Sequence, residues 1–265
     1  MVRRNTIAAI RYGYGLRPGE IQSSNLKTLR DGIGRIDDAE RRFPVILLES
    51  RATLMVERRE AQKAAKDGNS DSEAAKKQAV RKVRMQAAAD IKVTFQRAIE
   101  SRAGFRQRLI AFWTDHFTVA ANSPTLSVLV PDLIENAIRP DVAGKFGDML
   151  VAVTTHPAML IYLNQVQSVG PSSRAGKRRG RGLNENLARE VLELHTLGVS
   201  SAYTQEDVTQ LAKLLTGLSA DKSGFVFRKG ISEPGAETVL GKRYGGGKPN
   251  LYDIHQALQD IAIHP

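Results

Sequence analysis

Three polar residues whose side chains could do chemistry lie on one predicted helix, between residues 183 and 197. At about 100° of rotation per residue, Asn184, Glu190 and His195 fall within the same broad arc as the leucine and valine side chains. A polar group on an apolar helix face must find a hydrogen-bond partner or lose roughly 1–3 kcal/mol. We therefore expect each of the three to meet a specific partner, either a ligand or another group of the protein.

A carboxylate and a histidine can act together as general acid and base. Glu190 and His195 are five residues apart, which turns their directions about 140° from each other on an α-helix, so this helix alone cannot present both to one metal ion. His116 is the first outside candidate to join Glu190, and Asp115 and His156 follow. The structural alternatives are a buried ion pair for Glu190 and satisfied core positions for His116 and His195.

A basic loop punctuated by glycines covers residues 168–182, directly before this helix. Glycines and cations that lead into a helix N-terminus can offer backbone N–H groups, the positive end of the helix dipole and guanidinium donors to one anion. A mobile, solvated loop is the alternative. The predicted ligand-binding residues are Asn184 and the five cations of the loop: Arg174, Lys177, Arg178, Arg179 and Arg181.

Mostly helical elements must position these residues. Thr204 and Asp207 have the spacing of a capping box, and Gly198 is placed to end the helix that carries Glu190 and His195. A last helix is expected to begin at Asp253. The other apolar patterns predict helices over residues 39–66, 70–101, 105–117, 127–139, 142–154, 157–167, 183–197 and 204–217.

The polar turn at residues 67–70 joins two of these helices into an αα-hairpin. Segments 225–227 and 238–240, separated by a Pro-Gly turn, are predicted to pair as one short β-hairpin. The predicted fold is therefore mainly α, with a multi-helix, bundle-like body. We expect a single domain over residues 1–265, from which a charged helical hairpin at residues 51–101 projects.

The charge of the chain is concentrated in its N-terminal part. There are 39 Lys and Arg against 28 Asp and Glu, a net charge of +11. Residues 1–110 hold 24 of these cations and 13 of the anions, whereas residues 111–265 hold 15 of each. Much of the excess lies on the hairpin, as a solvated face or as a surface for an acidic partner. The hairpin has few interleaved aromatic residues, so a nucleic-acid partner is not favoured.

Several functional classes are excluded or disfavoured by composition. The chain has no cysteine, which excludes disulfides, thiolate metal sites and cysteine nucleophiles. No apolar run approaches the roughly 18 residues that cross a bilayer, so we expect no transmembrane segment. The N-terminal sequence reaches Arg11 after four apolar residues, which does not resemble an export signal and favours the cytoplasm.

Five segments together resemble the bacterial family known as domain of unknown function 1800. They are residues 11–19 (RYGYGLRPG), 112–117 (FWTDHF), 156–160 (HPAML), 184–198 (NENLAREVLELHTLG) and 203–208 (YTQEDV). The resemblance covers essentially the whole chain and implies a mainly helical fold. It also implies a longer protein, of which this chain would be a shortened form ending in the opening of a further family block, His264-Pro265. Many members of the family are exported, which leaves the periplasm open as a compartment.

The family has no established activity, so the resemblance assigns no catalytic residue. This sequence also departs from the family pattern at two places. Leu218 stands where many members have tryptophan, and residues 232–238 (SEPGAET) stand where a His-acid-x-Gly-x-Lys-Thr pattern is common. We therefore carry no catalytic role onto Ser232 or Glu237.

Two functions remain as hypotheses from the sequence. The first is a binding or accessory protein with a site for an anionic ligand or an acidic protein partner near the loop and helix at residues 171–198. The second is a hydrolase, with or without a metal ion, that uses Glu190 with His116 or His195. The sequence identifies no cofactor, metal or oligomeric state.

Overall fold

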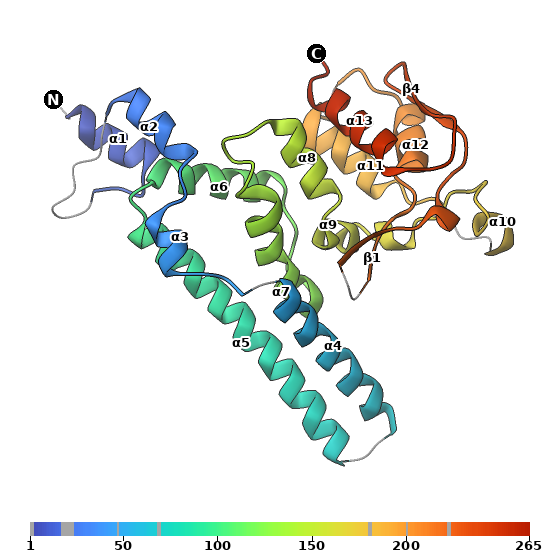
Figure 1. Ribbon diagram of the computed structural model, residues 1–265, viewed down its shortest axis with the longest axis horizontal. Helices are drawn as coiled ribbons and strands as arrows, with labels where there is room; N and C mark the ends of the chain where they lie inside the picture. The colour runs from blue at the N-terminus through green and yellow to red at the C-terminus, as the bar shows by residue number, and fades with distance from the viewer. Residues whose placement is uncertain are drawn as a thin grey trace. The chain divides into compact units, whose positions relative to one another are not determined.

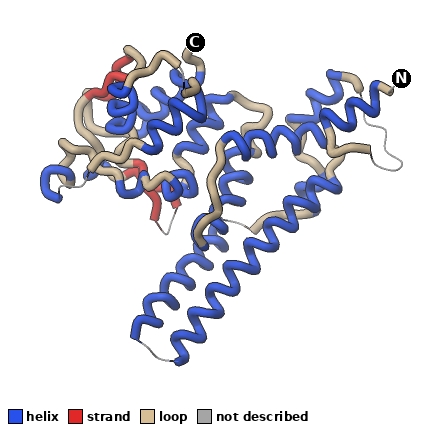
Figure 2. Tube along the Cα trace, turned by 180° about the vertical axis from the view of Figure 1, so that it is seen from behind, coloured by secondary structure: helices blue, strands red, loops and turns tan. Residues whose placement is uncertain are grey.

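The computed structural model describes residues 3–16, 24–46, 48–67, 70–179, 182–199, 201–221 and 224–265. The chain divides into two compact units, residues 1–144 and residues 145–265. Both units are built mainly from helices, and strands form only a small part of the second (Figures 1 and 2). The prediction of a mainly α fold is therefore confirmed.

The first unit contains the long helical hairpin and the shorter helices around its base (Figure 1). Its helices are α1 (Arg4–Tyr12), α2 (Leu26–Ile33), α3 (Asp38–Arg42), α4 (Leu48–Ala64), α5 (Ser70–Glu100), α6 (Gly104–His116) and α7 (Pro124–Leu133), with a short 3₁₀ turn, η1 (Ala65–Asp67), and a π-helical segment, η2 (Ile134–Ile138).

Helices α4 and α5 lie side by side as the two arms of the predicted hairpin (Figure 2). A fully buried guanidinium joins them, because Arg51 Nη1 and Nη2 donate to the two carboxylate oxygens of Asp90 at 2.8 and 2.9 Å. Arg51 Nη1 also donates to the carbonyl oxygen of Val128 in α7 at 2.9 Å. The single helix expected over residues 39–66 is instead two, since α3 ends at Arg42 and Pro44 restricts the residue before it to extended conformations.

The second unit is a helical core with two small β-hairpins. Its elements are α8 (Phe146–Thr154), α9 (Pro157–Tyr162), η3 (Gln165–Gln167), α10 (Gly176–Arg179), α11 (Asn186–Glu190), the π-helix η4 (Val191–Thr196), α12 (Gln205–Leu214), β1 (Leu218–Asp221), β2 (Gly224–Phe227), η5 (Lys229–Ile231), β3 (Ala236–Val239), β4 (Lys242–Gly245) and α13 (Leu251–Ala262). The core is apolar, and it includes the fully buried Leu150, Leu160, Leu192, Leu211 and Leu258.

The predicted capping box at the start of α12 is confirmed. Thr204 Oγ1 accepts a hydrogen bond from the backbone N–H of Asp207 at 3.1 Å, and Asp207 Oδ2 accepts one from the backbone N–H of Thr204 at 2.8 Å. The other oxygen of Asp207 accepts from the backbone N–H of Leu240 at 2.7 Å. The cap of α12 therefore also holds the turn between β3 and β4.

The predicted pairing of segments 225–227 and 238–240 is wrong. Phe225 pairs with Ala220 in a β1–β2 hairpin, and Val239 pairs with Lys242 in a separate β3–β4 hairpin. The turn of the second hairpin consists of Leu240 and Gly241, which both have positive φ, 49° and 75°. Two such residues match the twist of antiparallel strands, so β3 pairs with the segment that follows it directly.

Candidate functional site

The described part of the basic loop is packed against residues 230–233. The backbone N–H of Gly170 donates to the carbonyl oxygen of Ile231 at 2.9 Å, and the N–H of Ser172 donates to Glu233 Oε2 at 2.8 Å. The carboxylate of Glu233 therefore already accepts a hydrogen bond from one backbone N–H of the loop. These contacts hold the chain in place at residues 170–172.

Two glycines make this packing possible. A Cβ on Gly176 would lie 2.2 Å from the carbonyl oxygen of Gly170, and a Cβ on Gly170 would lie 2.6 Å from the backbone nitrogen of Glu233. Neither approach leaves room for a side chain. Gly170 and Gly176 thus serve close backbone contact, and the exposed side chains of Arg174, Lys177 and Arg178 project from this part of the backbone.

The described cations of the loop are Arg174, Lys177 and Arg178, and all three are exposed. They make no ion pair or side-chain hydrogen bond with any described residue. Arg179 is the last residue of α10, but the position of its side chain is not described, and Arg181 lies outside the described residues. We call Arg174, Lys177 and Arg178 together the basic surface.

Asn184 is part of the internal structure at the end of the loop. Its Nδ2 donates to the carbonyl oxygen of Leu163 at 2.9 Å, and its Oδ1 accepts from the backbone N–H of Asn186 at 2.9 Å. Its own backbone N–H donates to Ser168 Oγ at 3.1 Å. Asn184 precedes the helix, which begins at Asn186, and it fixes where the helix starts.

The helix that carries Glu190 and His195 is α-helical only over Asn186–Glu190 and continues as a π-helix over Val191–Thr196. The projection at 100° per residue is therefore wrong for its second half. Leu194, expected on the apolar arc, is 57% exposed, whereas His195 is only 4% exposed. In a π-helix the hydrogen bonds run between residues five apart, so residues with that spacing lie one turn from each other.

Glu190 is partly exposed and makes no ion pair or hydrogen bond with any described residue. Burial, and next the negative charge of Glu193, raises the pKa of its carboxyl group above the ordinary value. The buried ion pair considered from the sequence is thus not seen among the described residues. Glu190 can hold a proton at a higher pH than a solvated glutamate.

The histidine candidates occupy different surroundings. His116 belongs to the first unit and packs among aromatic rings, with centroid distances of 5.3 Å to Trp113 and 4.7 Å to Phe117. His195 belongs to the second unit and is buried. His156 is the N-cap of α9, where its Nδ1 accepts from the backbone N–H of Ala158 at 3.1 Å. The third outside candidate, Asp115, is exposed on α6.

The outer face of the same helix carries a polar network that was not expected from the sequence. Arg189 donates to Glu193 Oε1 at 2.9 Å and to Gln205 Oε1 at 2.9 Å. Glu185 accepts from Gln205 Nε2 at 2.9 Å and from Thr209 Oγ1 at 2.7 Å. The spacing of four residues between Glu185, Arg189 and Glu193 was a readable signal for it, and the network joins α11 to α12.

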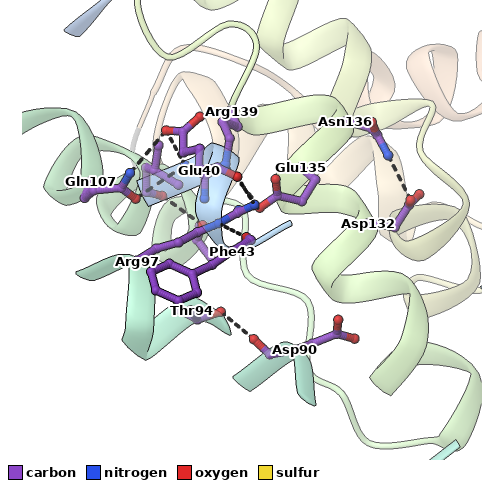
Figure 3. Close-up of polar contacts among 12 residues, drawn as sticks. Glu40, Phe43, Asp90, Thr94, Arg97, Gln107, Asp132, Glu135, Asn136 and Arg139 are labelled. Atoms are coloured by element: carbon purple, nitrogen blue, oxygen red, sulfur yellow. Dashed lines mark hydrogen bonds and ion pairs between the residues drawn. The ribbon is translucent and has the colours of Figure 1, made fainter. Parts of the chain in front are cut away.

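A second site lies wholly in the first unit and was not expected from the sequence. It is a cavity of about 400 Å³ lined by residues of α5, α6, α7 and η2, by Tyr14 and Val45, and by residues that follow α6 and η2, among them Phe117, Val119 and Arg139. Four of its lining residues, Arg97, Gln107, Glu135 and Arg139, belong to a cluster of ion pairs and hydrogen bonds. Figure 3 shows part of this cluster. Glu40 Oε1 accepts from Arg106 Nε at 3.0 Å, Gln107 Nε2 at 3.1 Å and Arg139 Nη1 at 2.9 Å.

A second carboxylate extends this cluster along the π-helix η2. Glu135 Oε1 accepts from Arg97 Nη1 at 2.6 Å and from Arg139 Nε at 3.1 Å, and Figure 3 shows Arg97 reaching Glu135 from α5. The members of the cluster come from α3, α5, α6 and the end of η2, so their proximity could not be predicted from spacing. The pair Glu135 and Arg139, four residues apart, was the one local signal.

The model of a family described as protein of unknown function (DUF1800) matches residues 7–265 of the chain. The chain belongs to the DUF1800 family. The match confirms the resemblance and spans both units of the structure. No curated protein and no solved structure matches the chain.

Within the described ranges, no group of three or more His, Asp or Glu side chains is placed to hold a metal ion. None of the described helices combines the length and the apolar character needed to cross a membrane.

Proposed function

We propose that this DUF1800 protein is a binding or accessory protein whose basic surface contacts an acidic protein partner or an anionic ligand. The observation that carries the proposal is that Arg174, Lys177 and Arg178 are exposed and unpaired among the described residues, on a backbone fixed by close glycine contacts. Cations held on a fixed backbone lose less conformational freedom on binding than cations on a flexible loop. Arg179 and Arg181, which follow directly in sequence, add to the positive charge.

The test compares two triple variants of equal charge. The first replaces Arg174, Lys177 and Arg178 with alanine, and the control replaces Lys77, Arg81 and Arg84, which are exposed on α5. The probe is a fluorescein-labelled peptide of glutamate residues, and its affinity is measured by fluorescence anisotropy at low salt. We expect the first variant to bind about tenfold more weakly, at roughly 0.5 kcal/mol for each exposed cation, while the control binds like the wild type.

Two outcomes would contradict this proposal. An equal loss in both variants would mean that the peptide responds to net charge alone, and no loss in the first variant would remove the basic surface from the site. A duplex DNA probe tests the alternative that the α4–α5 hairpin binds nucleic acid. Tight binding of DNA with a steep salt dependence, lost only in the α5 variant, would support nucleic-acid binding by the hairpin instead.

A hydrolase is the second candidate, because η4 changes the geometry on which Glu190 and His195 are presented. The π-helical bonding places residues five apart one turn from each other, and π segments inside helices are frequent at functional sites. A carboxyl group with a raised pKa suits a general acid. His195, on the same helix, would be its partner in proton transfer.

Hydrolysis of p-nitrophenyl acetate and of bis-p-nitrophenyl phosphate tests this candidate. Glu190→Gln should abolish any turnover that the wild type shows, whereas Glu206→Gln, which alters an exposed carboxylate of α12, should retain it. Turnover that survives in Glu190→Gln would end the role of Glu190.

A further inference from the structure

The cavity of the first unit has the size and the lining of a small-molecule site. Its volume of about 400 Å³ falls within the range of ligand pockets, roughly 300–1,000 Å³. Ile110, Phe117, Val119 and Leu133 are buried residues that supply apolar lining. The charged side is formed by Arg97 of α5, Glu135 of the π-helical segment η2 and Arg139, which follows η2. The cavity is distinct from the basic surface, which lies in the second unit.

Two polar atoms of the charged side are not used by the protein. Arg139 bonds through Nε and Nη1, and its Nη2 has no hydrogen-bond partner among the described residues. Glu135 accepts both of its hydrogen bonds at Oε1, and its Oε2 has no described partner. Neither atom is among the buried atoms that lack a partner, and Arg139 and Glu135 both line the cavity. The site thus offers one cationic donor and one anionic acceptor from the same ion pair.

The charges select the kind of ligand. A simple anion would meet the carboxylate of Glu135 beside Arg139, and the exposed Asp115 also lines the cavity. A simple cation would meet Arg97 and Arg139. An apolar molecule would displace water from both open atoms without replacing their hydrogen bonds, which costs binding free energy. A small zwitterion with an apolar body satisfies the two atoms and the apolar lining together.

We propose that the cavity binds an α-amino acid with an apolar side chain. The ligand carboxylate accepts from Arg139 Nη2, the ammonium group donates to Glu135 Oε2, and the side chain packs against the wall formed by Ile110, Phe117 and Val119. This assignment is independent of the function proposed for the basic surface. It gives the first unit a recognition role of its own.

Isothermal titration of the whole chain with three related ligands tests the proposal. Leucine carries both charged groups, 4-methylpentanoate lacks the ammonium group, and 3-methylbutylamine lacks the carboxylate. We expect leucine to bind and each analogue to bind at least about tenfold more weakly, because each leaves one accessible charged atom without a partner. Equal binding of leucine and either analogue, or no binding of leucine at millimolar concentration, would overturn it.

Two alanine-to-tryptophan variants locate the binding. Ala111 is exposed at the rim and lines the cavity, so Ala111→Trp should block entry and abolish leucine binding. Ala88 is exposed on α5 and does not line the cavity, so Ala88→Trp should bind leucine like the wild type. Unchanged binding in Ala111→Trp would place the ligand elsewhere and refute the assignment.

A third variant tests the role of Glu135. Glu135→Gln removes the negative charge and should lower the affinity for leucine to that of 4-methylpentanoate, with folding checked by circular dichroism. Full affinity for leucine in a folded Glu135→Gln variant would contradict the ammonium contact. If this variant fails to fold, the ligand series and Ala111→Trp still decide the question.

Discussion

Arg51 is a fully buried arginine, and its guanidinium depends on one carboxylate for charge compensation. Asp90→Ala would leave that guanidinium buried without a counter-charge, which we expect to cost about 3–5 kcal/mol in the free energy of unfolding. Urea denaturation followed by circular dichroism measures this loss. Replacing both residues with apolar ones, as in Arg51→Met with Asp90→Leu, should recover most of the stability because no charge is then buried.

An exposed ion pair of the same hairpin provides the control. Lys82 and Glu57 approach to 2.7 Å, but their side chains are 49% and 43% exposed. Glu57→Ala should therefore cost no more than about 1 kcal/mol. Similar losses in Glu57→Ala and Asp90→Ala would show that burial does not set the strength of these pairs.

Glu190 makes stability depend on pH in a direction that its surroundings determine. Since burial and Glu193 raise the pKa of its carboxyl group, the folded state binds the proton more tightly than the unfolded state does. Its contribution is therefore favourable below the ordinary glutamate pKa and is lost as the pH rises through the raised value. Glu190→Gln should be more stable than the wild type at neutral pH, and the difference should vanish below the ordinary pKa, as thermal melts across that range would show. A difference that instead grows toward acid pH would contradict a raised pKa.

At the scale of the element, the π-helix η4 decides which leucines of the helix are buried. Leu192 is fully buried and Leu194 is 57% exposed, although both lie on the arc that an α-helix would bury. Leu192→Ala should cost about 2–5 kcal/mol, as for other large-to-small core changes. Leu194→Ala should stay within about 0.5 kcal/mol of the wild type. Comparable losses, measured by urea denaturation, would show that the segment is α-helical in solution.

Sequence patterns predicted the elements whose signals are local. The αα-hairpin, the capping box at Thr204 and the helix end at Gly198 follow from residues close together in the chain, and the structure contains all three. The π-helix has no such signal, because its apolar pattern also fits the period of an α-helix. The pairing of β2 with β1 was not predicted. The Pro-Gly turn at residues 234–235 is also typical of the turn of a hairpin, so the segments on either side of it were expected to pair.

The two candidate sites differ in how far their residues could be predicted from the sequence. The loop cations precede one helix and could be named from the sequence, although the contact of Glu233 with the loop could not. Arg97, Gln107 and Arg139 line the cavity and come from separate parts of the chain, so only the folded chain brings them together. The catalytic roles considered for Glu190, His195 and His116 stay predictions.

At the scale of the whole molecule, the chain forms two compact units that meet in sequence at Gly144 and Lys145. A unit with its own apolar core can fold alone. We expect residues 1–144 and residues 145–265, expressed separately, to give cooperative thermal unfolding and dispersed amide spectra. The prediction of one domain over residues 1–265 competes with this one. Fragments that are both unfolded while the whole chain is folded would favour the single domain.

The π segments η2 and η4 also affect how relatives should be compared, because both lie inside the range matched by the family. A π turn holds one residue more than the α turn it replaces, so a relative without it is one residue shorter within the helix. Sequence alignments usually place a one-residue gap in a loop. The residues between that loop and the π turn would then be aligned with the wrong positions of the relative. The number of residues between the Asn-Glu-Asn and Leu-Gly ends of segment 184–198 can therefore be counted in each member of the family. This number separates members with a π turn in this helix from members with an α-helix throughout.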